Sequence, residues 1–165
     1  MAKLQQIVGF RVGKENFGVP IGIVHEIVRM MDITEIPDSP TYIEGVINLR
    51  GKIIPVVDLR KRFDEAIEPS RRNRIMVAEL DGHQVGLVVD SANEVMKVNS
   101  ELIEPPPNIF EQGELNYVTG VGKLDGKLVI MIDLTKIMQR GDLRRISDFA
   151  ATAEALAPTQ QARAD

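Results

Sequence analysis

The chain contains no cysteine and no tryptophan, and only 4% of its 165 residues are aromatic. The lack of cysteine excludes disulfides, zinc sites built on thiolates and cysteine nucleophiles. The scarcity of aromatic residues means that the core must be aliphatic, and an apolar fraction of 44% is enough to form one. The formal net charge of −4 argues against a general nucleic-acid binder, because such proteins need a basic face.

Long hydrophobic runs are also missing. The N-terminal sequence MAKLQQIVGF lacks the apolar segment of a signal peptide, and no run approaches the roughly 20 residues of a membrane-spanning helix. We therefore expect a soluble cytoplasmic protein without direct membrane insertion.

The sequence is organised around residues 45–63, GVINLRGKIIPVVDLRKRF, which predict a strand, a tight turn and a second strand. Pro55 inside the second strand favours an edge position or a bulge, because proline cannot donate to a ladder. Residues 120–138, GVGKLDGKLVIMIDLTKIM, match this stretch without a gap in the glycines, the apolar run and the closing Asp-Leu. The match indicates an internal duplication.

The duplication extends upstream of both stretches. Residues 7–21 and 75–89 each predict a hairpin, and residues 23–31 predict a strand entered through a short helical turn. Each half thus offers about five short strands, which predicts a mostly β protein with two small barrels that share a core. The groove between two such barrels is a reasonable binding site.

The expected organisation has five parts. They are an N-terminal arm at 1–6, a first barrel subdomain at 7–70, a second at 71–138, a C-terminal helix at 139–149, and a small, polar, alanine-rich tail at 150–165 that we expect to be disordered.

Catalytic and metal-binding signals are weak. A zinc site needs three or four ligands, and His25 and His83 are too few without a carboxylate cluster. Asp58 and Asp133 occupy matching places in the repeat, which favours strand-end or helix-start caps over a catalytic pair. We expect no catalytic residue, no cofactor and no metal site.

Two further groups of side chains each allow a purely structural explanation and a functional one. A solvated connector is favoured over a nucleic-acid patch for a small basic cluster at Arg71, Arg72 and Arg74. Core filling is the default for the methionines, and a peptide-binding surface is the alternative for Met30, Met31 and Met76.

Arg50 is the informative position within the central stretch. The second copy has Asp125 there, an ordinary residue before a turn glycine, so turn chemistry does not require arginine. Two explanations stay open: a salt bridge within the barrel, for example to Asp58, or a guanidinium that binds a partner's carboxylate or braces a binding face.

Four segments together carry a family resemblance: FGVPIGIVHEI at 17–27, IPDSPTYIEGVINLRGKIIPVVDLR at 36–60, VGLVVDSANEV at 85–95, and YVTGVGKLDGKLVIMIDL at 117–134. With them the chain resembles the CheW-type coupling proteins of bacterial chemotaxis over roughly residues 7–138.

The resemblance implies two SH3-like five-stranded barrel subdomains within a single domain at 7–149. It implies a non-catalytic adaptor that joins the cytoplasmic tip of methyl-accepting chemoreceptors to the regulatory domain of the histidine kinase CheA. It places the protein at membrane-associated receptor arrays, where further CheW copies can join the same rings.

The resemblance also assigns partner-binding positions. They are Val24, Glu26, Gly45, Arg50, Gly86 and Val95, with Ile75 and Met76 at the receptor groove and Ile109 at the kinase contact.

Two other functions remain as alternatives. A barrel pair that binds small ligands or oligonucleotides would need exposed aromatics and a basic groove. A CheW-like adaptor of a type IV pilus or another chemosensory pathway would have the same sequence features.

Overall fold

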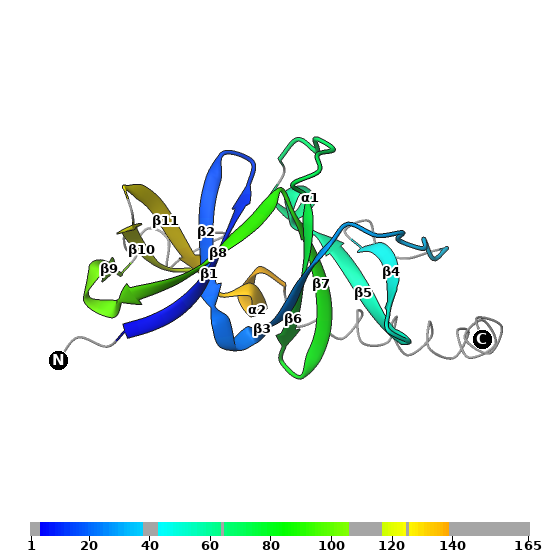
Figure 1. The fold of residues 1–165 in the computed structure, drawn as a ribbon, viewed down its shortest axis with the longest axis horizontal. Coiled ribbons are helices and arrows are strands. Elements are labelled where there is room, and N and C mark those ends of the chain that lie inside the picture. Colours follow the sequence, from blue (N-terminus) through cyan, green and yellow to red (C-terminus); the bar gives the residue numbers. More distant parts are fainter. Residues whose placement is uncertain (1–3, 38–42, 64, 106–116, 125, 139–165) are drawn as a thin grey trace.

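The computed structural model describes residues 4–37, 43–63, 65–105, 117–124 and 126–138 (Figure 1). Within these ranges eleven strands form two sheets, which confirms the mostly β prediction. The expected C-terminal helix at 139–149 and the tail at 150–165 lie outside the described residues.

Sheet A, on the left of Figure 1, has six strands in the order β8-β1-β2-β11-β10-β9. Their bounds are β8 Ser91–Asn99, β1 Leu4–Val12, β2 Glu15–Pro20, β11 Lys127–Ile132, β10 Val118–Leu124 and β9 Ile103–Glu104. β1 thus begins inside the segment that was expected to be an N-terminal arm.

Sheet B, on the right, has five strands in the order β3-β6-β7-β5-β4. Their bounds are β3 Val24–Arg29, β6 Arg74–Leu80, β7 His83–Val89, β5 Lys52–Asp58 and β4 Ile43–Leu49. Four short helical segments complete the described chain: η1 Ile21–Ile23, η2 Ser100–Leu102, α1 Leu59–Arg62 and α2 Leu134–Ile137. The turn η1 followed by β3 confirms the strand predicted at 23–31 and its helical entry.

Sheet membership does not follow the two halves of the sequence. The β1–β2 hairpin of the first half lies in sheet A with β8 to β11, and the β6–β7 hairpin of the second half lies in sheet B with β3 to β5. Parallel pairs join the halves, with Met131 opposite Gly18 and Val56 opposite Gly86. The division into 7–70 and 71–138 follows the sequence repeat, whereas the hydrogen-bonded sheets exchange their first hairpins.

The ends of each strand order are close in the chain. In sheet A the outer strands β8 and β9 are separated only by the three residues of η2. In sheet B the segment after outer strand β3 returns to the other outer strand, where Thr34 and Val46 exchange two backbone hydrogen bonds of 2.9 Å. Both sheets therefore curl until their first and last strands approach.

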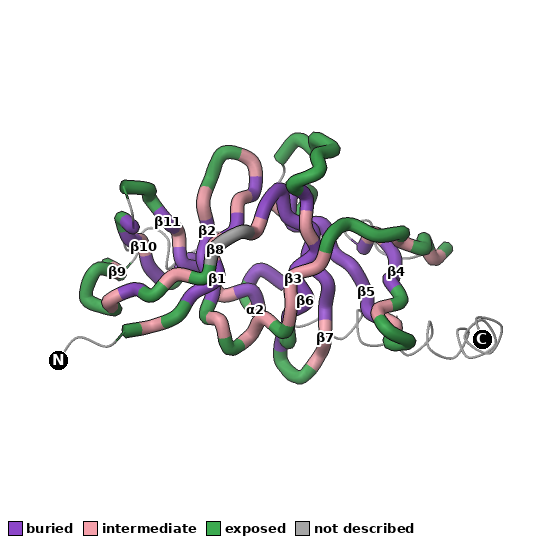
Figure 2. The backbone as a smooth tube through the Cα atoms, viewed as in Figure 1, coloured by how far each residue is buried: buried purple, intermediate pink, exposed green. Residues whose placement is uncertain are grey.

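The buried apolar side chains of the described residues form three clusters. Figure 2 marks the buried positions along the backbone. The largest cluster lies between the sheets and takes Val8 and Phe10 from β1 and Met76 and Leu80 from β6. Each sheet also encloses a smaller cluster of its own. Strands such as β6 are therefore buried on both faces, which explains their continuous apolar sequence.

The sequence predicts an edge position or a bulge at Pro55, and the edge position is wrong, because β5 has neighbours on both sides. A register shift does lie close by, between Ile43 and Gly45 of the facing strand β4. Val46, opposite Pro55, directs its N–H and C=O at Thr34, so Val46 and Pro55 form a non-hydrogen-bonded pair of the β4–β5 ladder. On the other side β7 pairs only with Val56 to Asp58. The missing N–H of the proline therefore falls just before that ladder begins.

A buried charged network fastens the two sheets to each other. The Asp58 carboxylate accepts from the Arg60 backbone N–H at 2.9 Å and from its guanidinium at 3.0 and 2.9 Å. The same guanidinium lies 3.5 Å from Asp90, which follows β7, and Asp90 accepts from the N–H of Gly13 in the β1–β2 hairpin at 2.7 Å. The hydrogen bond with Asp58 raises the pKa of Arg60, so the guanidinium stays charged.

We expect Arg60→Met to lower the free energy of unfolding by about 3–5 kcal/mol, because it leaves the carboxylates of Asp58 and Asp90 buried and unpaired. Urea unfolding monitored by circular dichroism measures the change. Lys61→Met is the matched control, since the neighbouring lysine side chain is 43% exposed, and it should cost less than about 1 kcal/mol. Equal stabilities of the two variants would show that the network contributes nothing.

Candidate functional site

Sheet B gathers most of the residues that the sequence predicts to bind partners. They are Val24 and Glu26 on β3, Gly45 on β4, Arg50 in the β4–β5 turn, Ile75 and Met76 on β6, and Gly86 on β7. Val95 lies apart from them on β8 of sheet A, and Ile109 lies outside the described residues.

Two of these residues are core residues. Ile75 and Met76 are both 0% exposed. Met76 belongs to the cluster between the sheets, and Ile75 belongs to the cluster inside sheet B. Because both side chains are fully buried, they cannot contact a partner directly, and they affect a binding surface only through the shape of the sheet that they support.

The two glycines allow strands to approach closely. A Cβ on Gly45, which has φ +147°, would lie 2.1 Å from the carbonyl oxygen of Thr34, and one on Gly86 would lie 3.0 Å from Ile75. In the second copy of the repeat, Gly120 is crowded in the same way, 2.5 Å from Ile103. The matched glycines are therefore explained by packing within the two sheets.

Arg50 forms an ion pair with Glu26. The pair joins the β4–β5 turn to β3, two parts of sheet B that lie at opposite ends of its strand order. A salt bridge inside the molecule is one of the two explanations that the sequence left open for Arg50, but the example partner Asp58 is wrong, because Asp58 binds Arg60. Asp58 and Asp133 cap α1 and α2 by accepting from backbone N–H groups at 2.9 Å, which confirms the capping prediction.

The backbone of Arg50 is in a conformation that arginine rarely adopts. Its φ is +53° and that of Gly51 is +87°, the pattern of a type I′ hairpin turn. Asp81 and Gly82 form the same turn between β6 and β7 with residues better suited to it. The side chain of Arg50 is 69% exposed, so most of the guanidinium is accessible for recognition of a carboxylate.

The predicted residues of β3 and of the β4–β5 turn that are not fully buried form the candidate interaction face: Val24, Glu26 and Arg50. Val24 is half-buried against the cluster between the sheets, and the Glu26 side chain is 31% exposed. An ion pair with this exposure stabilises a fold by about 1 kcal/mol at most, so its removal leaves the sheets intact.

Val95 on sheet A is a second exposed candidate, with 56% of its surface accessible. In the repeat it matches Ile27, which packs against the cluster between the sheets. The two halves have therefore diverged at this position, where Val95 is exposed and the matching Ile27 is packed.

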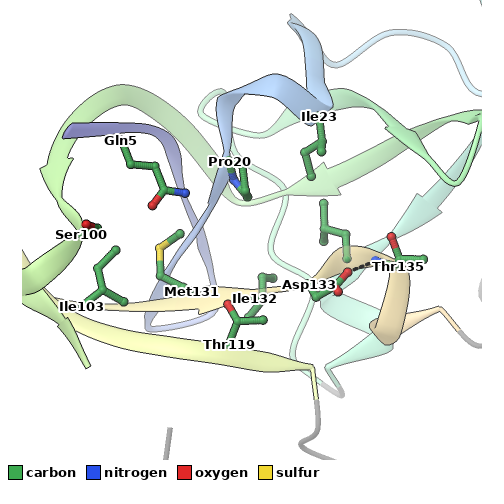
Figure 3. Close-up of a pocket in the computed structure, with 11 residues that line it drawn as sticks. Gln5, Pro20, Ile23, Ser100, Ile103, Thr119, Met131, Ile132, Asp133 and Thr135 are labelled. Carbon is green, nitrogen blue, oxygen red and sulfur yellow. Dashed lines mark hydrogen bonds between the residues drawn. The ribbon is translucent and has the colours of Figure 1, made fainter. Parts of the chain in front are cut away.

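A hollow of about 430 Å³ that the sequence did not reveal lies at one end of sheet A (Figure 3). Its walls include Pro20, Ile23 and Met131. Asp133 and Thr135 also line it, and the Asp133 carboxylate accepts from the Thr135 backbone N–H. Thr135 occupies the place that Arg60 has in the first copy of the repeat. The change from arginine to threonine between the two copies is the sequence feature that could have drawn attention to the hollow.

Metal-ligating groups do not assemble in the described ranges, where no cluster of three histidine, cysteine, aspartate or glutamate side chains could hold an ion. His25 lies 3.3 Å from Glu79 on the exposed side of sheet B, and His83 is half-buried at the start of β7. None of the helices in the described part of the chain is long and apolar enough to cross a membrane.

Comparisons with known proteins agree in sequence and in fold. A family model described as CheW-like domain matches residues 6–142. The chain is 35% identical to "Chemotaxis protein CheW" of Rhizobium meliloti (strain 1021) over 134 residues, covering 81% of this chain and 86% of that protein. It is 31% identical to the protein of the same name from Klebsiella aerogenes, covering 88% and 89%.

A more distant relative is "Protein FrzA" of Myxococcus xanthus, 28% identical over 87% of this chain and 91% of that protein. Among solved structures, the scaffolding protein TtCheW from Thermoanaerobacter tengcongensis is similar, with a TM-score of 0.74 and 41% identity. That match covers 83% of this chain and 94% of the other.

Gly45→Ala should lower the free energy of unfolding by more than about 2 kcal/mol, because the added Cβ meets the Thr34 carbonyl and the backbone is strained. Gly82→Ala is the matched control, since Gly82 also has positive φ, +82°, but nothing lies within 4 Å of its added Cβ. It should cost about 1 kcal/mol. If chemical denaturation gives equal losses, close packing at Gly45 is refuted.

Proposed function

The chain belongs to the CheW-like domain family, and on that premise we propose that it is a non-catalytic adaptor that couples transmembrane chemoreceptors to the histidine kinase CheA in bacterial chemotaxis signalling. The observation that carries the proposal is the family match over residues 6–142, which spans both sheets. The partners are the cytoplasmic tips of methyl-accepting receptors and the regulatory domain of the kinase, with further copies of the adaptor in the same array.

The exposed interaction face on sheet B is the proposed contact for one of these partners. Arg50 and Glu26 offer a charged pair, and the half-buried Val24 offers some apolar surface on the same strand as Glu26. Val95 on sheet A is proposed to serve a separate contact. The buried Ile75 and Met76 and the packed Gly45 and Gly86 would then affect binding through the shape of sheet B.

Each sheet corresponds in this proposal to one SH3-like barrel. Two observations support that finer assignment: β8 and β9 are consecutive strands at opposite ends of sheet A, and Thr34, shortly after β3, bridges to β4. The ion pair between Arg50 and Glu26 spans the corresponding closure of sheet B. Ile109 belongs to the proposal as a kinase contact on the resemblance alone.

Such an adaptor acts by holding two partners at once. Each contact can be modest, because linking two binding events raises the effective concentration of the second. A change in kinase activity then requires contacts that differ between assembly states. Work of this kind takes place at the cytoplasmic surface of receptor arrays and needs no catalytic group or cofactor.

The sequence features allow a second version of the same function. In that version the chain is an adaptor for a different chemosensory pathway, such as one that controls type IV pili. Reconstitution with the receptor and kinase of each pathway in turn distinguishes the two versions, because the chain should couple receptor to kinase only with its cognate pair.

Reconstitution tests the adaptor function. The purified chain is mixed with CheA and receptor-bearing membranes, and co-sedimentation and ATP-dependent autophosphorylation of the kinase are measured. We expect the chain to sediment with the membranes only when they carry receptor, and to raise kinase activity at least about tenfold through the linked contacts. An absence of both effects with every receptor set would contradict the proposal.

Arg50→Asn separates function from fold. Asparagine suits the positive φ of this turn better than arginine, which offsets the loss of an exposed ion pair, so the stability should stay within about 1 kcal/mol of the original chain. Kinase activation in the reconstituted system should fall at least about fivefold, because a charge-assisted contact is lost. Unchanged activation would remove Arg50 from the proposed contact, and clear destabilisation would make it a structural residue.

A further inference from the structure

A small polar hollow of about 220 Å³ lies away from the interaction face, beside the β1–β2 hairpin of sheet A. Three cationic side chains from three separate elements line it: Arg11 on β1, Arg72 in the connector before β6, and Lys127 at the start of β11. Asn16 on β2 and the nearly buried Ser91 on β8 add an amide and a hydroxyl. None of the described residues that line the hollow is acidic.

The positive charge of this hollow is not cancelled by the ion pairs of the described residues, which involve other cations. Arg11 is held in place because its guanidinium donates to the carbonyl of Gly13 at 2.6 Å. Three acidic residues of the described chain lie in or near that hairpin. Glu15, the first residue of β2, is exposed and does not line the hollow. Asp90 is already bound by Gly13 and Arg60, and the Glu65 carboxyl lies on the side of Gly13 where a Cβ would point.

The size and chemistry of the hollow define what fits it. A volume of about 220 Å³ excludes a folded segment, and the net charge of −4 argues against a nucleic-acid duplex. Three cationic residues around one hollow favour a compact multivalent oxyanion over a single carboxylate, because the Coulomb gain rises with the ligand's charge. Side-chain hydroxyl and amide groups are common donors to phosphate oxygens.

We propose that Arg11, Arg72 and Lys127 form a binding site for a phosphate-bearing small anion, a diphosphate in particular. None of the described residues proposed to bind receptor or kinase lines the hollow. Arg72 belongs to the connector between the two halves, whereas Arg11 and Lys127 belong to sheet A. Figure 1 shows the connector and the β1–β2 hairpin on the same side of the molecule. A bound anion would therefore fasten the connector to sheet A beside the link between Asp90 and Gly13.

Isothermal titration of the full chain with sodium pyrophosphate at low ionic strength tests the site. We expect saturable binding with one anion per chain, weakened by added salt through screening. Arg72→Ala and Lys127→Ala should each weaken binding about five- to tenfold, since each removes a charge-assisted contact. Arg72→Lys should recover part of the loss, because it retains the charge.

The control variant is Lys52→Ala, which removes an exposed lysine from the β4–β5 hairpin of sheet B. It should bind pyrophosphate as the original chain does, and circular dichroism should show every variant folded. A second titration with ADP identifies the source of the anion. Equal affinity assigns the site to a diphosphate on any carrier, and binding of pyrophosphate alone assigns it to the free anion.

Three results would overturn the proposal. They are an absence of saturable binding, undiminished binding by folded Arg72→Ala and Lys127→Ala variants, and an equal loss in Lys52→Ala, which would indicate attraction to net charge alone.

Discussion

The exchange of hairpins between the two halves is the constraint on which the structure depends. Neither half contains the strands of a complete sheet, because β1–β2 completes sheet A and β6–β7 completes sheet B. The parallel pairs β2–β11 and β5–β7 hold the exchanged hairpins, and the buried network of Arg60, Asp58 and Asp90 reaches the β1–β2 hairpin at Gly13. The two sheets are therefore fixed relative to each other by backbone ladders, a shared apolar cluster and a buried charge network.

That constraint separates the scaffold from the surface. Residues repeated in both halves, such as Gly45 and Gly120 or Asp58 and Asp133, pack strands or cap helices. Some differences between the halves fall at structural positions, such as Arg60 of the buried network, which Thr135 replaces in the second copy. Others occur where one copy has no structural need for its residue. Arg50 in a turn that suits asparagine or aspartate is one example. An adaptor must present its separate binding surfaces in a fixed relation. The exchanged hairpins provide this, because one sheet cannot move relative to the other without breaking the strand pairs that hold those hairpins.

The sequence was sufficient to predict the duplication, the hairpins, the caps and the family, because these depend on local patterns and on residues in one register. It could not show the hairpin exchange, since a strand has the same alternation whichever sheet it joins. The partner of Arg50 was also hidden, because Glu26 is distant in the chain and approaches only when sheet B curls. Burial of Ile75 and Met76 on opposite faces of β6 likewise follows from having a cluster on each side of the strand.

The most direct test of the interlocked fold is native-state hydrogen exchange resolved by mass spectrometry. If the hairpin exchange joins the halves into one folding unit, the slowest amides of β1–β2 in sheet A and of β6–β7 in sheet B should exchange through the same global opening. Their free energies of opening should agree within about 1 kcal/mol and fall together in urea. Opening of one sheet at a free energy lower by more than about 2 kcal/mol would contradict the account.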